Sequence, residues 1–391
     1  MTEALVPAPP KGLLPLLALA NFVIGMGAFV VVGILTPFAA DMGVTPATAG
    51  WLMTAYALVY AVSSPVLVAL TGRFDRKAVL LAGLSLFGLG AIAAALSPSF
   101  AAVLAARAVM AVGGGLVTPV CASITVGLVA PADRGRALAT VFGGLTLSQV
   151  LGVPVGAWLG YQFGWHAAFL AVTGLAVVVL VTLARLVPRG ITVPLASLAA
   201  LGQVLASGWR MGAVGFTVLF LGGIYCVYTF FAALMEARLG LGRDGVSLML
   251  LIFGAGAVAG NLVGGRMADR IGSNQTLMIL CAAQIVLLPL VSWVTLPFVP
   301  MAALIAVWSV FCWSFMAPQQ ARLAGLDAPR TPIMFALNAS AIYVGASVST
   351  FVGGQVLDSS GAFGALGLAG AAFMVAAGWS IWAVARAIVT R

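Results

Sequence analysis

Long intervals without a charged residue run through the chain from Gly12 almost to its C-terminal end. Within them, apolar residues occupy nearly every position, as they do from Leu13 to Val32. Strands of an outer-membrane barrel would instead alternate apolar and polar residues over about 10 positions. The pattern therefore predicts helices, which satisfy every backbone group inside lipid. Ten intervals reach the roughly 20 residues of a spanning helix, namely 12–40, 42–72, 78–106, 108–132, 137–184, 211–235, 245–265, 271–321, 331–357 and 359–385.

Two of these intervals, 137–184 and 271–321, are about twice the spanning length, and each is interrupted near its middle. The interruptions are Gly160, Gly164 and His166 in the first, and Pro297 and Pro300 in the second. Splitting both intervals gives twelve predicted spans. Residues 190–209 are just long enough to span, but Pro and Gly residues interrupt them. We interpret this stretch as a connecting segment with room for an interfacial helix.

Composition supports a membrane protein with these spans. Hydrophobic residues make up 63% of the chain and charged residues 7%, whereas a soluble domain carries about 25% charged residues. We therefore predict an all-α integral membrane protein of twelve transmembrane helices in two sets of six. The predicted parts are an N-terminal segment (1–11), a first six-helix bundle (12–187), a connecting segment (188–210), a second six-helix bundle (211–386) and a tail (387–391).

The 18 Lys and Arg residues are distributed unevenly between the two sides of the predicted membrane. An even helix count puts both termini on one side, and fifteen basic residues share that side: Lys11, Arg73, Arg76, Lys77, Arg134, Arg136, Arg185, Arg189, Arg210, Arg266, Arg270, Arg322, Arg330, Arg386 and Arg391. The other side keeps Arg238 and Arg243. This asymmetry predicts cytoplasmic termini in a bacterial inner (plasma) membrane. The basic residues are scattered over short loops, so a nucleic acid is not an expected partner.

The sequence lacks the residues and motifs that several kinds of chemistry require. The four cysteines lie one per predicted helix, and His166 is the single histidine, so neither disulfides nor a metal site are expected. The motifs H-E-x-x-H and G-x-S-x-G are missing, as is a phosphate-binding G-x-x-x-x-G-K-[ST] loop. We therefore expect no enzyme, no cofactor and no ATP drive within this chain. A channel normally assembles from several subunits, whereas we expect a monomer.

Two short basic turns recur six helices apart. Residues 71–77 follow the second predicted span and residues 264–272 follow the eighth, and each turn contains one Asp among arginines. Glycines allow two helix ends to approach closely, and an Asp among arginines can accept charge-assisted hydrogen bonds. We predict that these turns lock helix ends together and take part in conformational change through Gly72, Arg73, Asp75, Arg76, Lys77, Gly265, Asp269, Arg270 and Gly272.

Small residues recur every fourth position on three predicted helices. The fifth span carries Gly144, Ser148, Gly152, Gly156 and Gly160, with Pro154 inside the stripe. The eighth span carries Gly256, Gly260 and Gly264, and the eleventh carries Gly345, Ser349 and Gly353. Such stripes permit close helix packing in lipid. We interpret the fifth-helix stripe, with Gly152, Pro154 and Gly156, as a packing surface between the two bundles, where they must slide or rock.

The basic turns and the fifth-helix stripe resemble features of the major facilitator superfamily. The family signature after helix 8 is matched by Gly265, Asp269, Arg270 and Gly272, and the copy after helix 2 by Arg73, Arg76 and Lys77, with Gly72 and Asp75 at exchanged positions. Residues 143–169 are similar to the helix 5 signature of the drug:proton antiporter and sugar-efflux permease branch. The resemblance implies two pseudo-symmetric six-helix bundles, with helices 5 and 8 facing each other, and export by alternating access.

Arg107 lies near or within the fourth predicted span, where a charge at the helix centre costs about 2.5–3.5 kcal/mol. Two interpretations stay open. Either Arg107 faces a functional cavity, or it lies near the outer end of its helix and extends its side chain to the interface. The family similarly has an Arg in helix 4 before a glycine-rich run, which Gly113, Gly114 and Gly115 match here.

Sparse polar and aromatic residues inside the spans are candidates for a substrate cavity. Hydrogen-bonding groups set in aromatic surface suit a mostly uncharged, amphipathic small molecule. Each residue taken singly is equally compatible with a contact between helices. The candidates are Asn21, Tyr56, Tyr60, Arg107, Gln149, Tyr225, Tyr228, Trp308, Trp313, Asn338 and Tyr343.

All nine acidic residues fall at predicted helix ends or in loops, so the driving force stays open. Proton antiport generally needs a carboxylate that titrates within the membrane. Either Asp41 or Glu236 lies deeper than the predicted boundaries and couples protons, or the protein is an uncoupled facilitator. A lipid or lysolipid flippase is the nearest competing function. We predict a secondary transporter that exports drug-, sugar- or nucleoside-like molecules, with substrate, protons and membrane lipid as its partners.

Overall fold

The computed structural model, which describes residues 10, 12–130, 133–191, 198–327 and 330–389, contains twelve helical segments that are long and apolar enough to cross a membrane. The predicted number of spans is thereby confirmed. Nearly all of the predicted segment 1–11 and the end of the predicted tail 387–391 lie outside the described residues. The elements in chain order are α1 (Leu13–Met42), α2 (Pro46–Ala49), α3 (Trp51–Leu70), α4 (Arg76–Ala95), α5 (Phe100–Leu128), α6 (Arg134–Leu147), the π-helical turn η2 (Ser148–Gly152), α7 (Val153–Phe163), α8 (Trp165–Leu186), α9 (Leu198–Leu205), α10 (Gly208–Tyr228), α11 (Phe231–Leu239), α12 (Arg243–Ile271), α13 (Ser273–Trp293), α14 (Phe298–Trp313), α15 (Met316–Leu326), α16 (Thr331–Ser360) and α17 (Gly364–Val389).

Both double-length intervals break where the sequence predicts. Gly164 is the single residue between α7 and α8, and its φ of 84° is a conformation that glycine adopts without strain. α13 ends before the second break, and α14 begins directly after Pro297. The stretch 190–209 does not form a span in its described part, which contains the eight-residue helix α9 and the start of α10.

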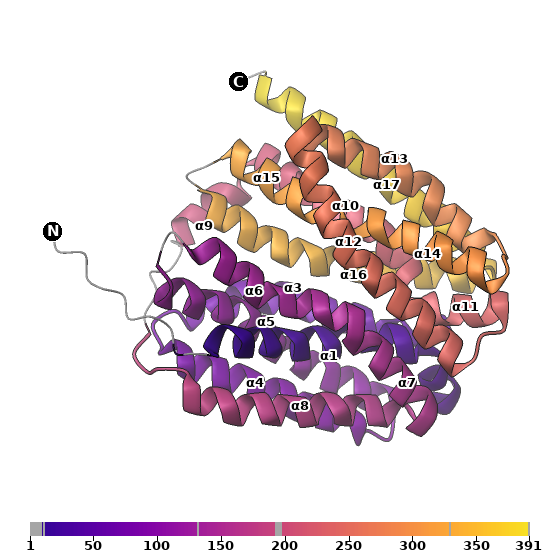
Figure 1. The fold of residues 1–391 in the computed structure, drawn as a ribbon, viewed down its shortest axis with the longest axis horizontal. Coiled ribbons are helices and arrows are strands. Elements are labelled where there is room, and N and C mark those ends of the chain that lie inside the picture. The colour runs from indigo at the N-terminus through magenta and orange to yellow at the C-terminus, as the bar shows by residue number, and fades with distance from the viewer. Residues whose placement is uncertain (1–9, 11, 131–132, 192–197, 328–329, 390–391) are drawn as a thin grey trace.

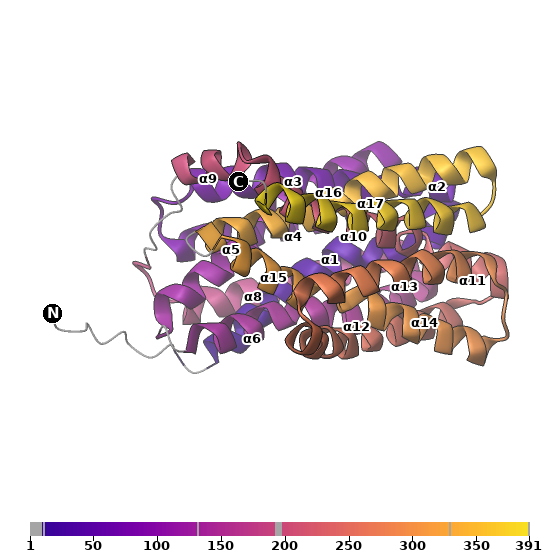
Figure 2. The ribbon, with the colours of Figure 1, turned by 90° about the horizontal axis from the view of Figure 1, so that it is seen from above.

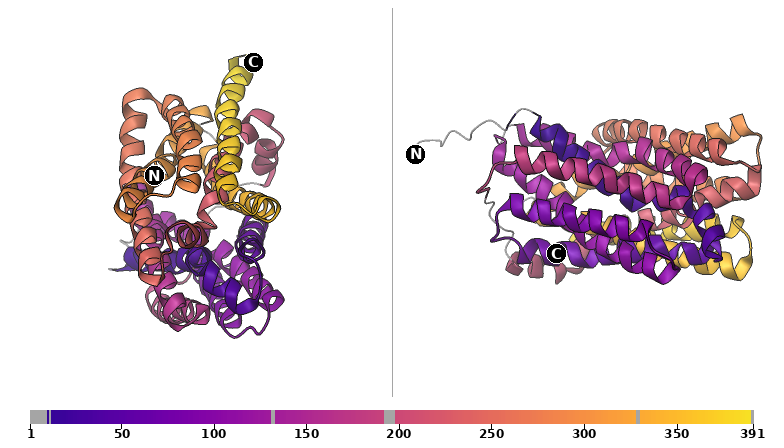
Figure 3. Two further views of the ribbon diagram at one scale, coloured as in Figure 1. Left: turned by 90° about the vertical axis from the view of Figure 1, so that its right-hand side faces the viewer. Right: turned by 90° about the horizontal axis from the view of Figure 1, so that it is seen from below.

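The spans form two halves with the same internal pairing, α1 to α8 and α10 to α17 (Figure 1). In the first half, α1 packs on α7 and α8, and α4 packs on α8. Six spans later, α10 packs on α16 and α17, and α13 packs on α17. Figure 1 draws the first half in indigo to magenta below the orange and yellow second half, and Figure 3 shows the same division from one end. The repeated pairing supports the predicted pair of related six-helix bundles.

The start of α1, the end of α17 and α9 lie toward one end of the molecule, called here the terminal end (Figure 2). The connections between α7 and α8 and between α13 and α14 lie toward the other end, called here the opposite end. Because successive spans alternate in direction, the terminal end corresponds to the side for which the charge asymmetry predicts the cytoplasm.

The small-residue stripes pack inside each half, so the predicted position of the fifth-helix stripe between the bundles is wrong. On the fifth span, Gly144 and Gly156 pack against α1. On the eleventh span, Gly345 packs against α10, which is the equivalent pair of helices in the second half. On the eighth span, Gly260 packs against α14. A missing side chain lets two helices approach closely, but a stripe of small residues does not specify which neighbour fills the space.

Two adjacent glycines of the fifth span provide a matched test of this packing. A Cβ added at Gly144 would overlap the Ala18 carbonyl oxygen of α1, whereas a Cβ at Gly143 would meet no atom within 4 Å. We expect Gly144→Ala to destabilise the fold by about 1–3 kcal/mol or more, because backbone must move. Gly143→Ala should instead stabilise it by up to about 1 kcal/mol, through helix propensity alone. Melting temperatures of the purified variants measure both effects, and equal values would contradict the stripe packing.

Candidate functional site

All six tyrosines of the chain lie at the contact between the two halves. Tyr60 of α3 stacks on Tyr343 of α16, with ring centroids 3.7 Å apart. Tyr225 of α10 stacks on Phe29 of α1, with centroids 5.9 Å apart. The remaining contacts join Tyr56 to Tyr343, Tyr228 to Gln149 and Tyr161 to Glu236. Five of these tyrosines were predicted as cavity residues, and the structure brings them together with Gln149.

A buried aromatic cluster crosses from the first half into the second. In the second half, the ring centroids of Tyr228 and Phe253 (α12) are 4.3 Å apart, and those of Phe253 and Trp308 (α14) are 4.9 Å apart. The Trp308 indole N–H donates to Oε1 of Gln284 at 3.1 Å, so its polar edge is already satisfied. The aromatic cluster comprises Phe29, Tyr56, Tyr60, Tyr225, Tyr228, Phe253, Trp308 and Tyr343, none of which is more than 6% exposed.

Several polar atoms in and beside this cluster are buried without a hydrogen-bond partner among the described residues. They are the hydroxyls of Tyr56, Thr118 and Tyr225 and the side-chain amide nitrogen of Gln149. Buried polar groups in folded proteins almost always have a partner, and an unpaired one costs about 1–3 kcal/mol. These four groups can therefore hydrogen-bond to a molecule that enters between the halves.

Gln149 reaches the second half from the π-helical turn η2 in the fifth span, where its Oε1 accepts a hydrogen bond of 3.2 Å from the Tyr228 hydroxyl. Pro154, just after this turn, has no N–H and its ring displaces the carbonyl of Val150, which favours the wider turn. Gly254 of α12 packs on η2, where a Cβ would overlap the Val150 backbone. Helices 5 and 8 thus face each other through Gly254 rather than through their stripes.

Arg107 is fully buried inside the first half. Its guanidinium donates to the carbonyl oxygens of Gly27 and Ala28 in α1. It also donates to the Leu52 carbonyl in α3 at 3.2 Å and lies over the Tyr56 ring, 4.3 Å from the centroid. No carboxylate pairs with it in the part of the chain that the structure describes. This burial contradicts the alternative of an interfacial anchor, and Tyr56 connects Arg107 to the aromatic cluster.

Besides Arg107 and Gln149, which contact the aromatic cluster, three predicted cavity residues lie outside it. The Asn21 amide donates to the Val141 carbonyl at 3.1 Å and joins α1 to α6. Asn338 of α16 accepts a hydrogen bond from the Thr217 hydroxyl of α10 inside the second half. Trp313 is half-buried at the end of α14, and the ring contacts of the described residues do not include it. The contacts of Asn21 and Asn338 are contacts between helices, the alternative that the sequence left open for each residue.

The aspartates of the two basic turns do not make the predicted hydrogen bonds to arginine. Asp75 accepts a hydrogen bond of 3.2 Å from the Lys77 backbone N–H and so caps its own helix, α4. Arg76 instead donates to the Gly72 carbonyl at 2.8 Å. Asp269 is exposed, and the ion pairs found within the described ranges involve other residues. An aspartate at an N-cap lies closest to the free N–H groups of its own first turn, which explains Asp75.

The remaining residues of the basic turns shape the turns locally. Gly272 is the single residue between α12 and α13, and its φ of 84° reverses the chain direction within one residue. A Cβ added at Gly265 would lie 3.9 Å from the Cβ of Ala317 in α15. Arg73 lies over the ring of the adjacent Phe74, and Arg270 is exposed. A role of these residues in conformational change stays a prediction.

The two acidic candidates for proton coupling lie toward the opposite end, and both accept hydrogen bonds from aromatic side chains. The Trp165 indole N–H donates to Asp41 Oδ2 at 2.8 Å within the first half. The Tyr161 hydroxyl of α7 donates to Glu236 Oε1 of α11, which links the two halves. Glu236 is half-buried, whereas Asp41 is exposed. Of the two, Glu236 is therefore the acid whose protonation would change a contact between the halves.

The two halves meet at their centre and at the opposite end. Besides the tyrosine contacts, the Ser347 hydroxyl of α16 donates to the Thr54 carbonyl of α3 at 3.1 Å. Trp51 and Phe351, one turn nearer to the opposite end, meet edge to face with centroids 5.3 Å apart. Among the described residues, no side-chain hydrogen bond joins the two halves at the terminal end. The described hydrogen bonds and ring contacts between the halves therefore lie at the aromatic cluster and on its side toward the opposite end.

Comparison with known proteins places this arrangement in a family. The model of the Major Facilitator Superfamily matches residues 17–350. The chain belongs to the major facilitator superfamily. Among curated relatives, the uncharacterized MFS-type transporter YbcL of Bacillus subtilis (strain 168) is 32% identical to this major facilitator protein over 349 residues, 88% of each chain. The inner membrane transport protein YdhP of Escherichia coli (strain K12) is 28% identical over 352 residues, 88% of this chain and 89% of the relative.

Solved structures share the fold of this major facilitator protein. A bacterial homolog to the human lysosomal transporter Spinster, in an inward-facing and occupied conformation, has a TM-score of 0.78 and 17% sequence identity, with 95% of this chain and 96% of the other covered. The same homolog in an inward-facing and unoccupied conformation has a TM-score of 0.74. The predicted family and fold are confirmed. This major facilitator protein is a multi-pass membrane transporter and not an enzyme.

Three residues in or beside the aromatic cluster, Phe29, Phe253 and Gln284, were not predicted from the sequence. Phe29 and Phe253 gave no signal, because a phenylalanine that faces lipid and one that lines a site look the same in an apolar span. Gln284 did give a signal, since a buried amide inside a span is unusual. Its role is to hold the Trp308 indole.

Proposed function

We propose that this transporter exports small, mostly uncharged amphipathic molecules, such as drug-, sugar- or nucleoside-like compounds. The buried aromatic cluster supports this most directly, because both halves contribute rings and unpaired polar groups lie beside it. Aromatic faces bind the apolar part of such a molecule, and a few hydroxyl and amide groups orient its polar part. The cluster and its four unpaired polar groups contain no carboxylate, so a permanently cationic substrate would find no counter-ion there.

Transport proceeds in this proposal by rocking of the two halves around the aromatic cluster. Contacts between the halves at the opposite end support a conformation that is closed on that side. The excess of basic residues at the terminal end supports a cytoplasmic position for both termini in a bacterial inner membrane. From this conformation the transporter would open next toward the cytoplasm, where an exporter takes up its substrate.

Proton coupling through Glu236 is the second part of the proposal. A carboxylate accepts a strong, charge-assisted hydrogen bond from the Tyr161 hydroxyl, and protonation of Glu236 weakens that bond. A proton from the outside would thus release α7 from α11 and favour opening at the opposite end. The alternative is an uncoupled facilitator of the same fold, in which Glu236 serves only as a contact.

A ligand screen followed by flux measurements tests both parts. Purified protein is first melted with sugars, nucleosides, amphenicol-like drugs and other lipophilic compounds, because a ligand selective for the folded state raises the melting temperature. The labelled hit is then followed in proteoliposomes with and without an inward proton gradient. We expect the gradient to accelerate flux in the wild type and in Asp244→Asn, an exposed acid at the same end, but not in Glu236→Gln.

Each other outcome identifies a different function. Wild-type flux that does not respond to the gradient would contradict coupling and support the facilitator. Movement of headgroup-labelled lipid without solute flux would support a lipid or lysolipid flippase. Single-channel current steps in planar bilayers would contradict alternating access altogether. We expect a monomer in all of these measurements, with membrane lipid, substrate and protons as its partners.

A further inference from the structure

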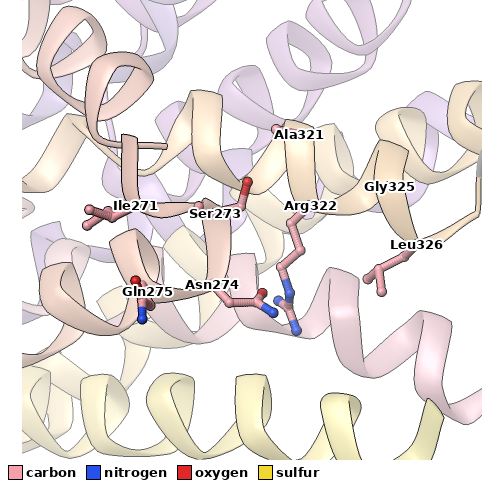
Figure 4. Close-up of a pocket in the computed structure, with 9 residues that line it drawn as sticks. Ile271, Ser273, Asn274, Gln275, Ala321, Arg322, Gly325 and Leu326 are labelled. Carbon is pink, nitrogen blue, oxygen red and sulfur yellow. The ribbon is translucent and has the colours of Figure 1, made fainter. Parts of the chain in front are cut away.

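A cavity of about 310 Å³ lies in the second half at the terminal end, between the start of α13 and α15 (Figure 4). It is separate from the aromatic cluster and shares no residue with it. Its volume is at the lower end of the range of small-molecule sites. The lining residues are Ile271, Gly272, Ser273, Asn274, Gln275, Ala321, Arg322, Gly325 and Leu326.

Arg322 is the one charged residue of this lining, and it has no ionic partner among the described residues. It is only 6% exposed, and its Nη1 has no hydrogen-bond partner there. Its nearest described aromatic contact is the Phe216 ring, 5.8 Å from the guanidinium carbon. Figure 4 shows the guanidinium turned toward the Asn274 amide across the cavity. A guanidinium stays charged in proteins, and a buried, unpaired charge is costly unless an anion compensates it.

The start of α13 faces the same cavity and adds further donors. The N–H groups of Ser273, Asn274 and Gln275 belong to the first turn of a 21-residue helix, so they have no acceptor within it. The positive end of the helix dipole lies at the same place. The side chains of these three residues carry hydroxyl and amide donors as well.

Nearby acids do not neutralise this site. Asp327, directly after α15, already accepts a hydrogen bond of 2.7 Å from Arg210 and lies 3.5 Å from Arg330. Asp269 is exposed on the last turn of α12 and does not line the cavity. The lining itself contains no carboxylate, so its electrostatic potential favours an anion.

We propose that this cavity binds an oxyanion of the phosphate type, held by the Arg322 guanidinium and the first turn of α13. Two parallel N–H groups of a guanidinium match two phosphate oxygens, and helix N-termini bind phosphate through their free N–H groups. The group can be the phosphodiester of an anionic membrane lipid or a free phosphate. Ile271, which lines the cavity and is exposed, is compatible with the lipid source. The proposal does not depend on the transported substrate.

Binding of two probes to the full chain tests this site. Purified protein is titrated with inorganic phosphate at constant ionic strength, and separately with short-chain phosphatidylglycerol, with phosphatidylcholine of the same chain length as the zwitterionic control. The midpoint of the rise in melting temperature reports the affinity. We expect Arg322→Gln to weaken binding about tenfold or more, as expected for loss of a charge-assisted hydrogen bond. Arg266→Gln, which removes an exposed charge outside the lining, should bind as the wild type does.

A second variant keeps the test valid if Arg322→Gln fails to fold. Gly325 lines the cavity, and a Cβ there would meet no atom within 4 Å, so Gly325→Leu fills the cavity and leaves the guanidinium in place. It should also lose binding. A response to both probes supports a site open to free phosphate, and a response to phosphatidylglycerol alone supports a lipid headgroup. No response in the wild type, or equal responses in the wild type and in folded cavity variants, would overturn the proposal.

Discussion

Substitution of Arg107 by alanine is expected to reduce transport at least tenfold while the protein still inserts and folds. The carbonyl oxygens that accept its hydrogen bonds, those of Gly27, Ala28 and Leu52, lie inside α1 and α3 and keep their helical N–H partners. Removal of Arg107 therefore leaves no acceptor unpaired and removes a buried charge. The substitution removes the hydrogen bonds that connect α5 to α1 and α3, and it removes the cation that lies over the Tyr56 ring.

The loss should affect transport because Tyr56 contacts Tyr343 of the other half. Flux of the ligand found in the thermal screen measures it, together with the amount of folded protein in the membrane. Arg107→Lys should also be impaired, since one ammonium group cannot reproduce the planar fork that bonds two helices and stacks on a ring. Arg185→Ala, which removes an exposed arginine at the end of α8, is the matched control. Normal flux in Arg107→Ala would contradict a role of Arg107 in transport.

The spans and their number were predictable because each helix must by itself meet the requirements of the lipid environment. A segment must be apolar along its whole length and must satisfy its own backbone, so the charge-free intervals and the break at Gly164 are visible in the sequence alone. Five of the six tyrosines, all but Tyr161, were predicted for a related reason. A polar hydroxyl inside a span is costly unless it faces protein or a site, and all six tyrosines do so.

The partner of each helix face was not predictable in the same way. Lipid and a neighbouring helix are equally apolar, so Phe29 and Phe253 could not be distinguished from lipid-facing residues. The glycine stripes indicated close packing correctly but not its location, which is α1 for Gly156 and α14 for Gly260. Asp75 was misread because its own helix start offers a nearer donor than any arginine does. These contacts depend on the arrangement of helices in space.

Gly254→Ala is the substitution that we expect to shift the equilibrium between conformations most. Gly254 is the point where α12 of the second half touches η2 of the first, and a Cβ there would overlap the backbone of Val150. Backbone cannot rotate away as a side chain does, so Gly254→Ala must move the halves apart at this point and weaken the hydrogen bond from Tyr228 to Gln149. Overpacking of about 1–3 kcal/mol would shift the equilibrium away from this conformation by about 5- to 150-fold.

Distances between spin labels measure this shift without a known substrate. In a variant without the four buried cysteines, one label pair at Phe163 and Val299 reports the separation of the halves at the opposite end. A second pair at Leu70 and Ile271 reports the terminal end. Gly254→Ala should change both distance distributions. Gly260→Ala, whose Cβ would meet α14 within its own half, should lower stability but leave both distributions unchanged, because its contact moves with the half. Identical distance distributions in the wild type and Gly254→Ala would mean that η2 and α12 stay in contact in every accessible state. Alternating access by rocking at this contact would then be wrong.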